Sequence, residues 1–204
     1  MNFSWPFART APRVVDVGCG DGDYLLAAAA RRAERDHVGI DLLRPVIERA
    51  AREAERRGLS NLRFLAGDAV AWLAGAEGLD EIHVYHPQPY VDPAEVHLGM
   101  LAPAFFESAW RALRPGGLLV LQTDERRYGT YLREAARKHF EPEALDGPWP
   151  DGPRTRREKT AAGKRLRVLR IEARRRDAPL AIDAPGPYFE RGGVRRRRPP
   201  RRER

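Results

Sequence analysis

The fold of this chain is decided by the glycine-rich stretch Asp16-Val17-Gly18-Cys19-Gly20-Asp21-Gly22. A β-branched run predicts a strand at Arg13 to Val17, and an alanine-rich pattern predicts a helix at Tyr24 to Arg35. Glycines in the turn between them let the backbone bend sharply and approach a bound molecule closely. Strand, glycine turn and helix in this order form the first unit of doubly wound α/β folds, which bind their ligand at that turn.

Strand and helix patterns continue to alternate after this unit. Short apolar runs predict further strands at His37 to Asp41, Leu62 to Ala66, Glu81 to Tyr85, Leu118 to Thr123 and Leu166 to Ile171. Helical patterns lie at Leu43 to Arg57, Ala69 to Leu73, Pro103 to about Leu113 and Arg126 to His139. The Pro- and Gly-rich segment from Glu141 to Pro153 predicts a loop. The predicted fold class is α/β, a Rossmann-like doubly wound fold with a mainly parallel sheet and helices on both faces.

A length of 204 residues fits one domain, which we place at residues 1–172. Most of the net charge of +8 follows it, because residues 173–204 hold eleven arginines and four acids. The Pro and Gly residues among these arginines predict a basic, disordered C-terminal tail. The tail is equally consistent with an arm that holds RNA phosphates and with a solvated end, since 34 arginines against three lysines indicate a compositional bias of the whole chain.

Cysteine usage and hydropathy indicate the compartment. The single cysteine, Cys19, excludes an internal disulfide framework and a multi-cysteine zinc site, and residues 1–10 lack the apolar run of a secretory signal. No apolar run approaches the length that spans a membrane. We expect a soluble, cytoplasmic protein without a metal and without a membrane partner. The sequence leaves the oligomeric state open.

Two acids after the glycine turn define a candidate ligand site. The turn has the spacing Gly-x-Gly-x-Gly rather than Gly-x-Gly-x-x-Gly, which disfavours a pyrophosphate on the helix N-terminus. Asp41 ends the second predicted strand, where a carboxylate can accept both hydroxyls of a ribose. Asp68 follows the third, where it can accept from an adenine amino group. Taken singly, each acid is equally consistent with a strand-end cap or a surface charge.

The order of these segments resembles that of class I S-adenosylmethionine (SAM)-dependent methyltransferases. The resemblance is carried by Asp16 to Gly22, Gly39 to Asp41, Gly67 to Ala69 and Leu113 to Gly117. It implies that SAM is the cofactor. It also implies that the cofactor is bound by Asp16, Gly18, Gly20, Gly22, Asp41, Asp68 and Ala69.

Within that superfamily the chain resembles the tRNA (guanine-N7-)-methyltransferases, from about Val14 to Ile171. Besides the glycine turn, the matching segments are His86 to Tyr90, Thr123-Asp124, and Thr155 to Glu158 followed by Gly163. The resemblance implies methyl transfer to N7 of a guanine in tRNA. It implies that the catalytic residues are Asp124 and Gln88 and that the substrate is bound by Asp124, Thr155, Glu158 and Tyr90.

The chemistry of that reaction suits these residue types. Guanine N7 has a free lone pair, so its attack on a sulfonium methyl group needs in-line placement and exclusion of water, but no base. A carboxylate can stabilise the positive charge that develops on the purine and can accept from its N1–H and N2–H₂ donors.

Two departures from the family pattern leave the methyl acceptor open. The family's Phe-Pro-Asp-Pro-Trp is here His86-Pro87-Gln88-Pro89-Tyr90, so a neutral amide replaces an acid. The family has a basic stretch after this motif that suits tRNA phosphates. Here it is replaced by Val91 to Leu98, so most of those phosphate contacts are lost. The alternatives are a SAM-dependent methyltransferase that acts on a small molecule or another RNA, and a SAM-binding remnant without turnover.

Several side chains also have simpler interpretations. Three histidines are interpreted as having no catalytic role, namely His83, His86 and His97. Tyr85 is expected to pack and Tyr90 to stack on a base. Cys19 is a small filler rather than a nucleophile, because no basic residue adjoins it. Without the family resemblance, Thr155 and Glu158 would be interpreted as a cap or as loop residues.

Overall fold

The computed structural model describes residues 5–90, 94–95, 98–186 and 188. Within these residues the sheet has seven strands: β1 (Arg13–Val17), β2 (Asp36–Asp41), β3 (Leu62–Ala66), β4 (Leu79–Tyr85), β5 (Leu113–Thr123), β6 (Phe140–Leu145) and β7 (Leu169–Arg175). The helices between them are α1 (Asp23–Arg31), α2 (Arg44–Arg56), α3 (Ala69–Leu73), α4 (Pro103–Ala112), α5 (Arg126–Ala136) and α6 (Arg156–Gly163).

The strand order in the sheet is β3-β2-β1-β4-β5-β7-β6. The first five strands pair in parallel, and β7 runs antiparallel between β5 and β6. The order reverses between β1 and β4, and sheets of this kind bind ligands at the carboxyl ends of the strands beside that point. The predicted fold class, a doubly wound α/β fold with a mainly parallel sheet, is confirmed.

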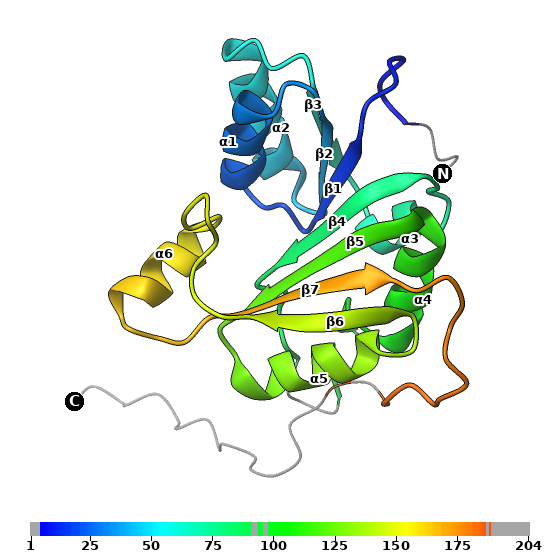
Figure 1. The fold of residues 1–204 in the computed structure, drawn as a ribbon. Helices are drawn as coiled ribbons and strands as arrows, with labels where there is room; N and C mark the ends of the chain where they lie inside the picture. Colours follow the sequence, from blue (N-terminus) through cyan, green and yellow to red (C-terminus); the bar gives the residue numbers. More distant parts are fainter. Residues whose placement is uncertain (1–4, 91–93, 96–97, 187, 189–204) are drawn as a thin grey trace, which may run out of the picture.

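Helices cover both faces of the sheet (Figure 1). On one face α1 and α2 pack on β2 and β3, and on the other α4 and α5 pack on the half of the sheet that contains β5. The yellow helix α6 stands apart from these layers, beside the end of the sheet where β4 and β5 finish (Figure 1). The carboxyl edge of the sheet is therefore bordered by α6 and by the loops that follow β1 to β5.

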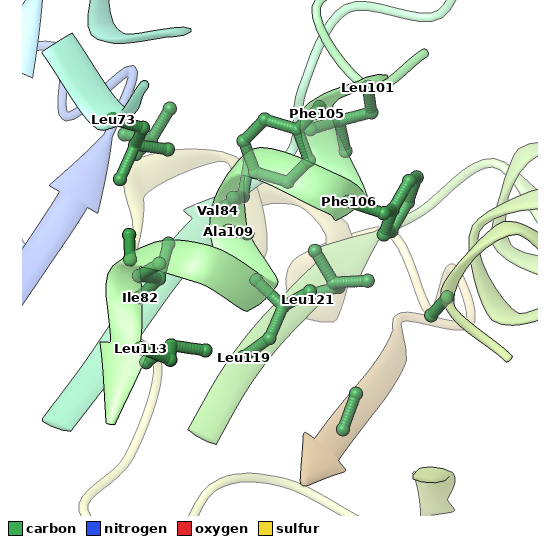
Figure 2. Packing of buried hydrophobic residues seen from close by; sticks show 14 of the residues in the cluster. Leu73, Ile82, Val84, Leu101, Phe105, Phe106, Ala109, Leu113, Leu119 and Leu121 are labelled. Atoms are coloured by element: carbon green, nitrogen blue, oxygen red, sulfur yellow. The ribbon is translucent and has the colours of Figure 1, made fainter. Parts of the chain in front are cut away.

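The main core lies between α4 and the strands β4 and β5 (Figure 2). The rings of Phe105 and Phe106 are buried with their centroids 5.5 Å apart. They belong to one cluster with Ile82 of β4 and with Leu119 and Leu121 of β5. Burial of each such side chain contributes about 1.5–3 kcal/mol, so this layer fixes the two strands whose carboxyl ends carry candidate site residues.

Two elements of the second half were not predicted. β6 lies in the segment predicted as a loop, because Pro142 and the charged residues around it conceal the strand pattern. Pro is tolerated there because β6 is an edge strand. α6 follows after a connection of residues 146–155, and the hydroxyl of Thr155 caps it by accepting from the N–H of Glu158 at 3.1 Å. The interpretation of this residue pair as a cap is thus confirmed for Thr155.

The chain remains in the sheet and packed on the domain beyond residue 172, where we placed the end of the domain. β7 extends to Arg175, where the sequence prediction ended the strand at Ile171. The chain then keeps packing on the domain: Arg176 Nε donates to the carbonyl of Phe140 at 2.9 Å, and the ring of Tyr188 lies 4.8 Å from that of Tyr128. Eight of the eleven arginines of the predicted tail come after residue 189 and lie outside the described residues.

Candidate active site

The glycine turn after β1 is bonded to the end of β2. The N–H groups of Gly18 and Cys19 donate to the carbonyl of Ile40 at 2.8 and 3.1 Å. The N–H of Gly20 donates to Oδ2 of Asp41 at 3.0 Å. Gly18 and Gly20 have φ angles of 73° and 54°, left-handed values that favour glycine. These φ angles, rather than crowding, explain why the turn favours glycine at both positions.

A cavity of about 400 Å³ opens beside this turn, at the carboxyl ends of β2 and β3. Four of the residues predicted to bind the cofactor line it, namely Gly18, Asp41, Asp68 and Ala69. Most of the remaining lining is apolar and includes Ile40, Leu42, Val70, Met100 and Phe105. An apolar pocket of this size with a few polar groups is typical of small-molecule sites. It suits a nucleoside, with apolar walls for the base and carboxylates for its donors.

Asp41 and Asp68 use only part of their hydrogen-bonding capacity on the protein. Asp41 accepts from Gly20 through Oδ2 and from the N–H of Leu43 through Oδ1, each at 3.0 Å. Asp68 caps α3 through Oδ1, and its Oδ2 has no partner among the residues that the structure describes. Because a carboxylate offers about four acceptor sites, both groups retain sites for the donors of a ligand.

Asp16 does not line this cavity but is buried nearby in β1. The residue is 3% exposed, and its Oδ1 has no hydrogen-bond partner in the described part of the chain. Burial and the carboxylate of Asp41 raise the pKa of Asp16 to about 8, against the attraction of the Arg154 guanidinium. A buried carboxyl oxygen without a partner is costly, and a ligand cation would relieve that cost. The sulfonium and ammonium groups of SAM are such cations, so the residues of this site fit SAM.

Gly20 and Gly22 serve the turn itself, since neither lines the cavity. Gly22 has a φ of 72°, and a Cβ there would overlap the end of the Phe64 ring, so both the turn and the packing beside β3 favour glycine. Burial next to two carboxylates raises the pKa of the Cys19 thiol, which keeps it protonated. This agrees with the interpretation of Cys19 as a filler.

A chain of hydrogen bonds holds Asp124 just after the carboxyl end of β5. Trp149 Nε1–H donates to Oε1 of Gln122. Nε2 of Gln122 lies 2.8 Å from Nε2 of His86, and Nδ1 of His86 lies 3.3 Å from Oδ1 of Asp124. Because an amide nitrogen can only donate, Nε2 of His86 accepts and its Nδ1–H donates to Asp124. The direction of each bond is therefore set, and the chain ends on a carboxylate.

Asp124 is held in its ionised form. Burial alone would raise its pKa, but the Arg157 guanidinium, with Nε 2.9 Å from Oδ1, and the bond from His86 lower the pKa below the ordinary value. Burial lowers the pKa of His86, which keeps its ring neutral. The backbone of His86 has a φ of 50°, a strained value for this residue type that the bonds on both ring nitrogens help to hold. Sequence reasoning missed this role of His86.

Thr155 and Glu158 face groups of the protein itself. Thr155 caps α6, as described above. Glu158 is 1% exposed, and its Oε1 lies 2.5 Å from NH2 of Arg170. Its Oε2 accepts from the backbone N–H of Arg154 at 2.8 Å. The buried ion pair therefore fastens the segment before α6 to β7.

Arg154 makes contacts that sequence reasoning did not anticipate. Its guanidinium carbon lies 3.9 Å from the centre of the Trp149 ring, and NH1 donates to the hydroxyl of Tyr85 at 2.8 Å. The Tyr85 ring is buried, so its predicted packing role is confirmed. Because the chain is rich in arginine, the sequence does not single out Arg154. Only its position directly before Thr155 distinguishes it.

The loop after β4 carries the two remaining predicted residues. Gln88 is exposed and Tyr90 is half-buried, and neither side chain forms a hydrogen bond within the described residues. Since His86 starts this loop and contacts Asp124, the loop begins at the same edge of the sheet. Most of the segment Val91 to Leu98 lies outside the described residues.

Comparison with known proteins decides the family. The profile of the family described as "Putative methyltransferase" matches residues 10–171. The tRNA (guanine-N(7)-)-methyltransferase of Halorhodospira halophila is 34% identical over 167 residues, which are 78% of this chain and 72% of that protein. The chain belongs to the tRNA (guanine-N7-)-methyltransferase family. The enzyme of the same name from Nitrosococcus oceani is 30% identical over 161 residues, 76% of this chain and 68% of that protein. The family resemblance predicted from the sequence is confirmed, and with it SAM as the cofactor.

Solved methyltransferase structures share the fold of this family member. The 16S rRNA methyltransferase KamB superposes with a TM-score of 0.63 at 17% identity and covers 82% of this chain and 89% of its own. The precorrin-6y C5,15-methyltransferase of Geobacter metallireducens has a TM-score of 0.57 at 12% identity, covering 82% of both chains. At such identities the likeness concerns the fold alone.

Two negative findings apply to the part of this family member that the structure describes. No helix there combines the length and the apolar character that a membrane span requires. None of the described His, Cys, Asp and Glu side chains gather into a group of three or more that could hold a metal ion.

For this family member we expect Glu158→Gln to lower the free energy of unfolding by about 3 kcal/mol, as for other broken buried ion pairs. The substitution leaves the Arg170 guanidinium buried without its counter-charge, while the amide oxygen can still accept from Arg154. Urea denaturation measures the change. Glu143→Gln, at an exposed residue, is the control and should change stability by less than about 0.5 kcal/mol. A loss as small as that of the control would contradict the structural role of Glu158.

Proposed function

We propose that this chain transfers the methyl group of SAM to N7 of a guanine in tRNA. The observation that carries the proposal is the ionised Asp124 carboxylate at the carboxyl end of β5, held by His86 and Arg157. This carboxylate lies at the same edge of the sheet as the cofactor cavity. It can therefore accept hydrogen bonds from a purine that is bound beside the methyl donor. Membership in the tRNA (guanine-N7-)-methyltransferase family supports guanine as that purine.

In this proposal the cofactor is held by the turn and the two strands beside it. Asp41 accepts the ribose hydroxyls, Asp68 accepts from the adenine amino group, and Ala69 and Gly18 line the wall. Asp16 faces the cationic end of the cofactor, while Gly20 and Gly22 keep the turn in shape. Bound SAM supplies an electrophilic methyl group.

The remaining work is the positioning of the guanine. Its N7 lone pair attacks directly, so no residue has to remove a proton. Asp124 accepts from N1–H and N2–H₂ on the opposite edge of the base and stabilises the positive charge that develops on the ring. Gln88 and Tyr90 lie on a loop that starts beside Asp124, where an amide can bond the base edge and a ring can stack on it. Thr155 and Glu158 act indirectly, by fixing α6 and the residues before it.

The proposed macromolecular substrate is tRNA, which places the reaction in the cytoplasm. The relatives in the comparison carry tRNA in their names, and the arginines of residues 189–204 supply charge for its phosphates. Labelled SAM is incubated with tRNA transcripts that carry or lack the guanine of the variable loop. We expect label only in the first transcript. Equal label in both would contradict the proposed acceptor, and label in small molecules alone would favour the other class of substrate.

The affinity for SAM is expected to rise with pH up to about pH 8. The pKa of Asp16 is raised to about 8 in the folded protein, so the group is protonated below that value. A cationic ligand favours the carboxylate, so binding releases a proton and tightens by up to about tenfold per pH unit below the pKa. Titration calorimetry at several pH values measures the slope, and Asp16→Asn should flatten it. A slope unchanged in the variant would contradict the placement of the cation beside Asp16.

The same group gives the folded protein a pH dependence of its own. The pKa of Asp16 is higher in the folded protein than in the unfolded chain. The contribution of the protonated Asp16 to the free energy of unfolding is therefore complete below about pH 4 and is lost as the pH rises toward about pH 8. The unfolding temperature of Asp16→Asn should therefore rise relative to that of the wild type as the pH increases over that range. This check separates a change in the fold from a change in SAM binding.

A further inference from the structure

A second cavity, of about 240 Å³, adjoins Asp124 on the side away from the cofactor cavity. It lies between α5, the end of β6 and the segment that leads into β7, at the carboxyl edge of β5. Its lining is Asp124, Arg126, Gly129, Thr130, Arg133, Ala144, Leu166, Arg167, Leu169 and Ile171. None of the groups proposed above to bind SAM belongs to it, so it is a separate site.

Three arginines surround this cavity: Arg126, Arg133 and Arg167. All three are exposed, and none of them forms an ion pair or a side-chain hydrogen bond in the described part of the chain. Many other arginines of this protein are paired, as Arg157 is with Asp124. Arg126 and Arg133 are seven residues apart on α5, a spacing that places them on one face of the helix. The cavity thus carries unpaired positive charge at its rim.

The floor of the cavity is apolar. Leu169 and Ile171 of β7 form it, and Gly129 of α5 allows the close approach, since a Cβ there would lie 2.5 Å from Cδ1 of Leu169. Leu166 stands at the cavity with 51% of its surface exposed. An apolar floor under a rim of arginines suits a ligand with a flat or carbon-rich part and an anionic part.

The acids near the cavity do not cancel this charge. Asp124 is a single carboxylate against three guanidinium groups, and it already forms an ion pair with Arg157 and accepts from His86. The neighbouring Glu125 accepts from the backbone N–H groups of the first turn of α5 and from the hydroxyl of Tyr188. The anion of a ligand therefore meets the three free guanidinium groups.

We propose that this cavity binds the nucleotide of the tRNA that adjoins the methylated guanosine. The three arginines bind the phosphates of this nucleotide, and its ribose or base packs against Leu169 and Ile171. A volume of about 240 Å³ is below the roughly 300 Å³ at which pockets for drug-sized ligands begin, so it accepts a single nucleotide. Phosphate contacts fix register and orientation. The site would thus set which guanosine reaches Asp124, and it rests on the function proposed above.

The test compares Arg133→Ala and Arg167→Ala with Arg52→Ala, which removes an exposed arginine of α2 at the other end of the sheet. We expect each cavity variant to weaken tRNA binding on the order of fivefold and to reduce the salt slope of log Kd by about 0.7–0.9, the loss of one phosphate contact. Arg133→Lys should retain most of the affinity, because its ammonium still neutralises a phosphate. The control and the affinity for SAM should not change.

A second variant tests the apolar floor. Ala144→Leu fills the cavity from β6 without changing charge, and should raise KM for tRNA while leaving the salt slope as in the wild type. The proposal is overturned if the cavity variants match Arg52→Ala in tRNA affinity and slope, or if Ala144→Leu leaves KM unchanged. Filter binding to tRNA needs no turnover, so failure of this site is distinguished from failure of methyl transfer to tRNA, which the transcript assay reports.

Discussion

Asp41→Ala is expected to weaken SAM binding on the order of 10²–10⁴-fold. The Asp41 carboxylate lines the cofactor cavity and retains acceptor sites for the two ribose hydroxyls. Hydrogen bonds to a charged group contribute about 1.5–3 kcal/mol each, so two of them amount to about 3–6 kcal/mol. That range corresponds to the stated change in Kd at about 1.4 kcal/mol per tenfold. Titration calorimetry with SAM measures it directly.

Two further variants make the result on Asp41 interpretable. Alanine also frees the N–H groups of Gly20 and Leu43, which could loosen the turn. Asp41→Asn retains one oxygen for this backbone but loses the charge, so SAM binding should still fall while thermal unfolding stays close to that of the wild type. Asp146→Ala, at an exposed acid outside the cavity, should bind SAM normally. Undiminished SAM affinity in both Asp41 variants would rule out the cofactor site described here.

Asp124→Ala is expected to lower kcat/KM for methyl transfer to tRNA on the order of 10²–10³-fold, the usual effect of losing one electrostatic contact to a transition state. The carboxylate is ionised and is fixed by His86 and Arg157, so its loss removes the acceptor for the guanine donors and the charge that faces the purinium. SAM binding should be retained, because Asp124 does not line the cofactor cavity. Single-turnover methylation with saturating SAM measures the effect.

The asparagine variant sharpens this prediction. Asp124→Asn preserves shape, but its amide presents donors as well as an acceptor to the guanine N1–H and N2–H₂ groups, so it should be nearly as impaired as alanine. Asp183→Ala, an exposed acid after β7, is the control and should methylate at the wild-type rate. Wild-type turnover by Asp124→Asn would mean that the charge on this residue has no part in the reaction.

The first half of the fold could be predicted closely from the sequence. β1, β3 and α3 have the predicted bounds, because apolar runs there are bounded by glycine or aspartate. In the second half, α4, α5 and the end of β5 also agree with the prediction. β6 and α6 were missed, because an edge strand and an exposed helix leave weaker patterns. β6 carries a proline and three acidic or small residues in a six-residue strand, and β7 ends in arginines that composition assigned to a tail.

That the proposed cofactor residues Asp41 and Asp68 lie close together could be predicted from the sequence, because parallel strands end at one edge of the sheet. Asp41 and Asp68 each follow a predicted strand, and the structure brings both to one cavity. Asp16 is buried near the cavity and does not line it. The local sequence pattern does not indicate how deeply a side chain at this position is buried.

The substrate side was less predictable because its contacts join distant parts of the chain. The bond of His86 to Asp124 spans 38 residues, and the pair of Glu158 with Arg170 joins α6 to β7. Motifs identified Asp124, Thr155 and Glu158 as residues of interest. Only the structure shows that the Asp124 side chain keeps 14% of its surface exposed while Glu158 is enclosed by the protein.

Replacing the acceptor guanosine of a tRNA transcript by 7-deazaguanosine tests whether the N7 lone pair of that guanine accepts the methyl group. The analogue keeps the N1–H and N2–H₂ donors that Asp124 would accept, but it has a C–H group in place of the N7 lone pair. We expect the protein to bind both transcripts with similar affinity, to methylate the guanosine transcript and to leave the analogue unmethylated. Methyl transfer to both transcripts at the same rate would contradict N7 as the acceptor.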